Sequence, residues 1–210
     1  MRNVLPFLLT AAIALSFTKC SKDDPTGLGS VIVKDDLNDP SLWSYEIQDS
    51  SGYNSASSSG IFSNGSLEIA VNQGEDCEIS RALRGLEEYS NTIEESLEQS
   101  DTLILALDGV SADYAGMGTA TFVFHYAKKQ VSVDIPYGAS STEYLIYITN
   151  DAIHRVLING AEAEAVTSYV RWSEETSQAW LFQLDVRACG ADLYAYAKIS
   201  LERLRLYQKS

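Results

Sequence analysis

Apolar and polar residues alternate along much of the chain, and this period of two predicts β-strands. Runs rich in β-forming residues predict strands over residues 144–149 and 153–158, and the Asn159-Gly160 turn signal closes the second strand. Residues 60–62 and 67–71 flank a further turn and predict another hairpin. The clearest case is a strand, a polar turn at Lys128-Lys129 and a second strand, with the apolar positions Phe122, Phe124, Tyr126, Val131, Val133 and Ile135.

One segment departs from this alternation. Leu86, Tyr89, Ile93 and Leu97 recur at spacings of three and four within a Glu-rich stretch. Helical side chains spaced in this way share one face, so the segment is expected to form a short amphipathic helix on the sheet surface.

The last part of the chain predicts a hairpin with a defined register. If residues 189–192 form a two-residue turn with Gly190 first, opposed residues have numbers that sum to 381. One face then pairs Trp180, Phe182, Leu184 and Val186 with Leu201, Ile199, Ala197 and Ala195, and is core. The other face pairs Gln183, Asp185 and Arg187 with Lys198, Tyr196 and Tyr194. A shift of the apolar phase between Leu201 and Leu204 predicts a bulge near Glu202-Arg203.

Many short strands with hairpin signals indicate a mainly β protein. The expected fold over residues 31–210 is an antiparallel two-sheet β-sandwich of the jelly-roll type, with one short helical excursion. Trp43 and Trp180 are expected in its core.

The composition agrees with a folded domain and limits the kinds of partner that the protein is expected to bind. The 210 residues are 45% hydrophobic and carry a formal net charge of −14. Nucleic-acid binding is not expected, because it depends on clustered Lys and Arg side chains that this acidic chain lacks.

The N-terminus has the features of an export signal. Residues 4–17 form an almost unbroken apolar run of fourteen residues after a positive start, too short for a permanent membrane span. Residues 16–20 resemble a loose lipobox, although Lys19 departs from its usual small residue. The resemblance implies a signal peptide over 1–19, lipidation of Cys20 and a tether over 20–30. The acidic Ser21-Lys22-Asp23-Asp24 resembles the signal for the outer face of the outer membrane; an ordinary secretory peptide is the alternative.

Removing residues 1–19 takes away Arg2 and Lys19 and no acid, so the mature net charge becomes −16. The membrane is therefore expected as a partner only through the lipid anchor. With Cys20 lipidated, Cys77 and Cys189 remain as an even pair in an exported protein. They form either a disulfide or two separate thiols, since spacing alone does not show whether their Cα atoms approach.

Three stretches resemble concanavalin A-like and laminin-G-like jelly-roll modules of the carbohydrate-binding type. They are residues 36–43, 150–160 and 198–207, about a seventh of the chain. The resemblance implies a lectin-like fold, and because such modules often hold Ca²⁺, a structural ion near Asp35, Asp36, Asp39 or Glu202 stays open. No other cofactor and no specific metal site is expected.

Catalysis has little support in the sequence. Glycosidases with this fold place two carboxylates about 5 Å apart, whereas Asp134 and Asp185 each stand alone on their strands. His125 and His154 lack a recognisable Ser or Cys nucleophile motif beside them. No catalytic residue is assigned, and a glycoside hydrolase with acids on separate strands is the minor alternative.

Binding is better supported, because a sugar needs aromatic rings for its C–H face beside groups that hydrogen-bond its hydroxyls. A solvated sheet face with occasional Tyr residues would show the same residue types. The expected function is glycan binding at the cell surface, as an accessory to polysaccharide capture; the rival is a structural or adhesion lipoprotein that binds a protein. The candidate binding residues are Gln183, Asp185, Arg187, Tyr194, Tyr196, Tyr169 and Trp172.

Overall fold

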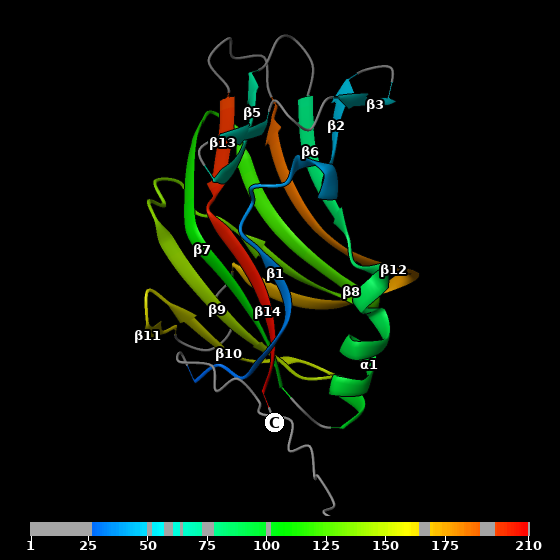
Figure 1. Cartoon of the computed structure of the whole chain (residues 1–210). Helices are drawn as coiled ribbons and strands as arrows, with labels where there is room; N and C mark the ends of the chain where they lie inside the picture. The colour runs from blue at the N-terminus through cyan, green and yellow to red at the C-terminus, as the bar shows by residue number, and fades with distance from the viewer. Residues whose placement is uncertain are drawn as a thin grey trace, which may run out of the picture.

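The fold is a sandwich of two antiparallel sheets, as predicted (Figure 1). The computed structural model describes residues 27–49, 52–56, 61–63, 65–72, 78–99, 102–163, 169–189 and 196–209. In Figure 1, β7, β13 and β14 cross in front of β8 and β12, and the core lies between these layers. Among the described residues, no helix has the length and apolar character that a membrane crossing requires.

The larger sheet has nine strands in the order β11-β10-β9-β7-β13-β5-β4, with β14 placed between β7 and β1. Asn159 and Gly160 both have positive φ, of 51° and 75°, and form the predicted turn between β10 and β11. The strands are β1 (Ser30–Asp35), β4 (Phe62–Ser63), β5 (Ser66–Asn72), β7 (Thr102–Ala115), β9 (Thr142–Ile148), β10 (Ile153–Ile158), β11 (Ala161–Glu162), β13 (Tyr196–Leu201) and β14 (Arg203–Lys209).

The smaller sheet has the order β3-β2-β6-β12-β8. Its strands are β2 (Ser44–Asp49), β3 (Gly52–Ala56), β6 (Glu78–Gly85), β8 (Thr119–Asp134) and β12 (Val170–Ala188). β8 folds back on itself at Ala127, whose φ is +54°, and the backbone N–H of Ile135 donates to the carbonyl of Ala120 over 2.9 Å. The predicted strand, turn and second strand are therefore confirmed. β12 pairs with both arms of β8, through residues 170–174 and 179–187.

Aromatic side chains fill the centre of the sandwich. Phe122, Phe124 and Phe182 are at most 1% exposed, and the rings of Phe124 and Phe182 lie 5.2 Å apart. Trp43 and Trp180 are buried as expected. These rings remove large apolar areas from water, which is the main favourable contribution to folding of such a core.

The predicted helix is present. A 3₁₀ turn, η3 (Glu87–Tyr89), leads into α1 (Ser90–Glu98), which packs on β7 and β8. Ile93 and Leu97 are buried on its inner face, while its glutamates face outward. The spacing of three and four thus identified the buried face of the helix.

The predicted C-terminal hairpin is wrong. β12 pairs with β6 and β8 in the smaller sheet, whereas β13 pairs with β5 and β7 in the larger one. The apolar positions assigned to the core are buried in both strands wherever the structure describes them. They meet across the sandwich instead of side by side, because both strands turn their apolar faces inward.

The bulge predicted near Glu202-Arg203 is not found against β7, because the pairs Ser200–Ser111 and Arg203–Asp108 keep one register. The strand is nevertheless interrupted at this point. β13 ends at Leu201 and β14 begins at Arg203, and both pair with β7. On the facing strand, Gly109 has a φ of +67°, and a Cβ at this position would lie 2.4 Å from the Glu202 side chain. A glycine is therefore required where the two strands shift their apolar phase together.

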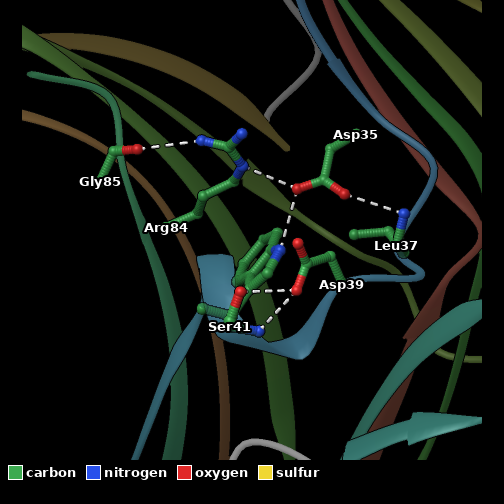
Figure 2. Close-up of polar contacts among 7 residues, drawn as sticks. Asp35, Leu37, Asp39, Ser41, Arg84 and Gly85 are labelled. Atoms are coloured by element: carbon green, nitrogen blue, oxygen red, sulfur yellow. Dashed lines mark hydrogen bonds and ion pairs between the residues drawn. The ribbon is translucent and has the colours of Figure 1, made fainter. Parts of the chain in front are cut away.

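A buried polar cluster joins β1 to β6 (Figure 2). The carboxylate of Asp35 accepts hydrogen bonds from the backbone N–H of Leu37 at 2.8 Å, Trp43 Nε1 at 2.9 Å and Arg84 Nε at 2.7 Å. The side chains of Asp35 and Arg84 are only 2% and 4% exposed. The Asp-rich stretch before Trp43 therefore has a structural role, because the three donors compensate the burial of a negative charge.

The next acidic residues of this stretch lie at the surface. Asp39 accepts from Ser41 Oγ and from the backbone N–H of Ser41, and these bonds hold the pKa of Asp39 below its usual value. Asp39 thereby caps the 3₁₀ turn η1 (Pro40–Leu42). The hydrogen bond and charge of Lys34 lower the pKa of Asp36, which is also near Arg205.

Several predictions of the sequence fall outside the described residues. They are the signal peptide, lipidation of Cys20, the tether up to residue 26, and the positions of Cys77 and Tyr194. Cys189 follows β12 and is disulfide-bonded. Its pairing with Cys77 stays a prediction.

Candidate functional site

A row of polar side chains crosses the outer face of the smaller sheet. Arg81, Asp185 and Thr121 are direct cross-strand partners on β6, β12 and the first arm of β8. Thr121 Oγ1 then donates to Asp134 Oδ1 on the second arm over 3.2 Å. Neighbouring inward positions, such as Phe122 and Leu184, are core. The pleat therefore directs the whole row away from the core.

The row ends at a pocket of about 300 Å³ where the two sheets meet, which we call the tyrosine pocket. β7 of the larger sheet leads through a short turn into β8 of the smaller sheet at this point. Gly118 makes the turn possible, because a Cβ there would lie 2.5 Å from the carbonyl oxygen of Tyr196 and 2.8 Å from Tyr114 Cβ. The pocket is lined by Tyr114, Thr119, Ala120, Thr121, Asp134, Ile135, Pro136 and Tyr169.

Asp134 is held in place by three hydrogen bonds. Arg171 Nη2 donates to Asp134 Oδ1 over 3.0 Å, Arg171 Nη1 donates to Oδ2, and Thr121 provides the third bond. The hydrogen bond and charge of Asp134 raise the pKa of Arg171. A carboxylate has about four acceptor positions, so Asp134 is oriented and can still accept one more hydrogen bond.

Exposed apolar side chains gather around this pocket. In the described part of the chain, the five exposed large apolar residues are Val31, Leu42, Met117, Tyr137 and Tyr169. Tyr169 lines the pocket at 48% exposure, and Met117 lies two residues before Thr119. Tyr137 is 67% exposed, and its ring meets Tyr114 edge-on at 5.5 Å between centroids. One of the five therefore lines the pocket, a second contacts a lining residue, and the third lies in the turn before the lining residue Thr119; exposed apolar side chains that gather in this way mark interaction sites.

The structure separates the residues that were predicted as one binding face. Gln183 and Asp185 do share a face, and Gln183 Nε2 donates to Asp185 Oδ2 over 2.7 Å. Arg187 lies further along β12, where its Nε donates to Cys189 Sγ. Tyr196, however, lies on the outer face of the larger sheet, and a hydrogen bond with Asp113 raises its pKa. This correction follows directly from the wrong hairpin register.

Tyr169 and Trp172, the two aromatic candidates outside the predicted hairpin face, have different positions. Tyr169 lines the tyrosine pocket and is the one predicted residue found among its lining residues. Trp172 is part of β12, packs against the core and donates from Nε1 to the Tyr126 hydroxyl over 2.8 Å. Burial raises the pKa of Tyr126 to about 12. Trp172 therefore has a structural role, since it packs on the core and hydrogen-bonds Tyr126.

Sequence reasoning missed Tyr114, Tyr137 and the role of Asp134. Tyr114 continues the inward alternation of β7 and is half-buried, so nothing local distinguishes it from a core residue. The Pro136-Tyr137-Gly138 run is a turn signal that contains an aromatic residue, and it could have drawn attention to Tyr137.

The acidic residues considered for Ca²⁺ do not converge. Within the described ranges, no group of three or more His, Cys, Asp or Glu side chains is arranged to hold a metal ion. Asp36 and Glu202 do line one pocket of about 740 Å³, but Arg203 lines it as well. The carboxylates of Asp35 and Asp39 accept hydrogen bonds from protein groups, Asp35 in the buried cluster with Arg84 and Asp39 from Ser41.

The two histidines and two aspartates considered for catalysis are held by burial, a ring contact or arginine partners. Burial lowers the pKa of His125, which is therefore neutral at neutral pH. His154 lies on the other sheet, with its ring edge-on to Tyr147. Asp134 and Asp185 each accept hydrogen bonds from an arginine, an arrangement that suits holding a ligand better than donating a proton to it.

Known structures with a similar fold include two kinds of binding domain. The carbohydrate recognition domain of Emp47p is 10% identical, with a TM-score of 0.46 over 84% of this chain and 94% of that domain. The binding domain of botulinum neurotoxin serotype C1 is 6% identical, with a TM-score of 0.38 over 80% of this chain and 49% of that one. No family model and no curated protein matches the chain. Similarity at this level does not determine a function for this chain.

Proposed function

We propose that the tyrosine pocket binds carbohydrate. A sugar ring presents an apolar C–H face that stacks on aromatic rings, and hydroxyl groups that both donate and accept hydrogen bonds. The pocket offers Tyr114 and Tyr169 for stacking, and Asp134 and Thr119 for hydroxyl groups. The observation that carries the proposal is the gathering of exposed apolar side chains around a carboxylate that Arg171 and Thr121 hold in place.

A glycan array and polysaccharide gel-shift assays with the purified protein test this proposal. We expect retention by at least one glycan, and a loss of affinity of about tenfold in Tyr169→Ala, because stacking on a half-exposed ring contributes about 1.4 kcal/mol. Leu42→Ala is the matched control, since Leu42 is similarly exposed but lies in η1, on a different segment of the fold. The control should bind like the unchanged protein, and both variants should keep its melting temperature.

Other outcomes would reject the proposal. If no glycan is retained, or if both variants bind equally well, the pocket is not a carbohydrate site and a protein-binding adhesion role becomes the better interpretation. Release of reducing sugar from a bound polysaccharide would show that the protein is instead a glycoside hydrolase.

We also propose that the protein is a lipoprotein, anchored through Cys20 at the outer face of the outer membrane. The proposal rests on the apolar run 4–17 and the lipobox-like residues 16–20. The Cys20→Ser variant should lose the lipid-dependent mass increase and leave the membrane fraction, since lipid chains provide the membrane affinity. Membrane association that is unchanged in Cys20→Ser would contradict the anchor, and protection of the protein from added protease in intact cells would contradict surface exposure.

A further inference from the structure

The tyrosine pocket is closed at its base by backbone. Ala120 and Ile135, from the two arms of β8, are its most buried lining residues at 2% exposure each, so we take them as its floor. The hydrogen bond between Ile135 N–H and the Ala120 carbonyl joins them, and the Tyr114 hydroxyl donates to the Ile135 carbonyl over 3.3 Å. The backbone N–H of Asp134 donates to the Tyr169 carbonyl over 2.7 Å, which fixes the wall that bears Tyr169. A ligand can enter from the surface but cannot continue through this floor.

The size of the pocket restricts the ligand further. Its volume of about 300 Å³ lies at the lower end of the range for small-molecule sites. An extended cleft for several consecutive sugar units would need more room and two open ends. The pocket therefore suits a single ring at the end of a glycan chain.

The charge of the lining argues for a neutral ring. Asp134 is the one charged side chain among the lining residues, and Arg171 directs two hydrogen bonds to it. A carboxylate on the ligand would meet the negative Asp134, whereas the Arg171 guanidinium is not among the lining residues and already donates two hydrogen bonds to Asp134. Like charges at close range oppose binding, whereas a hydroxyl can donate to the remaining acceptor position of Asp134.

We infer that the tyrosine pocket recognises one uncharged sugar residue at the end of a glycan, and excludes uronic acids. This inference rests on the carbohydrate-binding function proposed above and narrows it. It predicts that affinity depends on the terminal ring and hardly on the length of the chain behind it.

Calorimetric titration tests both parts. The probes are neutral oligosaccharides of two to six units that end in the residue selected on the array, the methyl glycoside of that residue, and its uronic acid counterpart. We expect dissociation constants within about threefold from two to six units, competition by the methyl glycoside, and binding of the uronic acid at least tenfold weaker. An affinity that rises tenfold or more from two to six units would overturn end recognition, and equal binding of the uronic acid would overturn the charge selection.

An Asp134→Asn variant separates recognition from a structural effect. It should weaken neutral-ligand binding about tenfold and bring the uronic acid closer to the neutral ligand, because the negative charge is gone. Asp108→Asn is the control, since Asp108 is also paired with arginines, at 3.2 Å to Arg203, but on the larger sheet. A purely structural role would weaken both ligands equally and leave their ratio unchanged, which would overturn the charge selection. Absence of binding to every glycan on the array is a different result, and it rejects the proposed function itself.

Discussion

Replacing Asp35 by alanine is expected to lower the free energy of unfolding by about 3–5 kcal/mol. The substitution leaves the guanidinium of Arg84 buried without its carboxylate, and removes the acceptor of Trp43 Nε1 and of the Leu37 N–H (Figure 2). An uncompensated buried charge costs far more than the lost contact itself. Urea unfolding, with the denaturant dependence checked for an unchanged slope, measures the effect.

The neighbouring residue provides the control. Asp36 has 39% of its side chain exposed and pairs with Lys34 at the surface, so Asp36→Ala should cost less than about 1 kcal/mol. If Asp35→Ala does not fold, Asp35→Asn, which keeps the shape and an acceptor oxygen, should fold with an intermediate loss. The double variant Asp35→Leu/Arg84→Leu should recover much of the stability, because no charge then remains buried. Equal losses in Asp35→Ala and Asp36→Ala would show that the cluster in Figure 2 has no special role.

The second large effect is expected at Cys189. Cys189 is disulfide-bonded and directly follows β12, which pairs with β6, and Cys77 directly precedes β6 in the sequence. Because opposed residues of an antiparallel ladder have Cα atoms about 4.5–5.5 Å apart, which a disulfide can bridge, we predict Cys77 as the partner of Cys189. A Cys77–Cys189 bond closes a loop of about 112 residues, so Cys189→Ala should lose about 4–5 kcal/mol in the chain-entropy description.

Peptide mapping without reductant should recover residues 77 and 189 in one linked fragment. Guanidinium unfolding should show the same loss of stability for Cys189→Ala, Cys77→Ala and the double variant, and reductant should destabilise the unchanged protein but none of the variants. A linked fragment that contains Cys20 would contradict both this pairing and the lipid anchor. An unchanged unfolding midpoint in Cys189→Ala would contradict the stabilising role of the bond.

Much of the fold followed from local patterns. The alternation at Phe122, Phe124 and Tyr126 identified the inward face of β8, because side chains on a strand point to opposite sides in turn. The spacing of Ile93 and Leu97 identified α1 for the corresponding helical reason. The Asn159-Gly160 turn was predictable because both positions need positive φ, which Asn and Gly adopt more readily than other residues.

The pairing of β12 and β13 was not predictable in this way. The two strands are consecutive and both alternate, which suits a hairpin and equally suits two strands that face each other across a sandwich. Alternation reports which side chains are buried, but it does not report which strand lies beside which. The predicted binding face combined Asp185 with Tyr196 and failed for this reason, since these residues lie on opposite outer faces.

The candidate site depends on contacts between distant segments. Tyr114, Asp134 and Tyr169 come from β7, β8 and the residue before β12, and meet only because β8 folds back and β12 pairs with both of its arms. The sequence by itself determined the β class, the buried face of most elements, the helix and the turns, because each depends on neighbours within a few residues. Only the tertiary structure decided the order of strands, the burial of Asp35 against Arg84, and the gathering of tyrosines around Asp134. These arise from the packing of two sheets, where the partners of a side chain are set by long-range contacts.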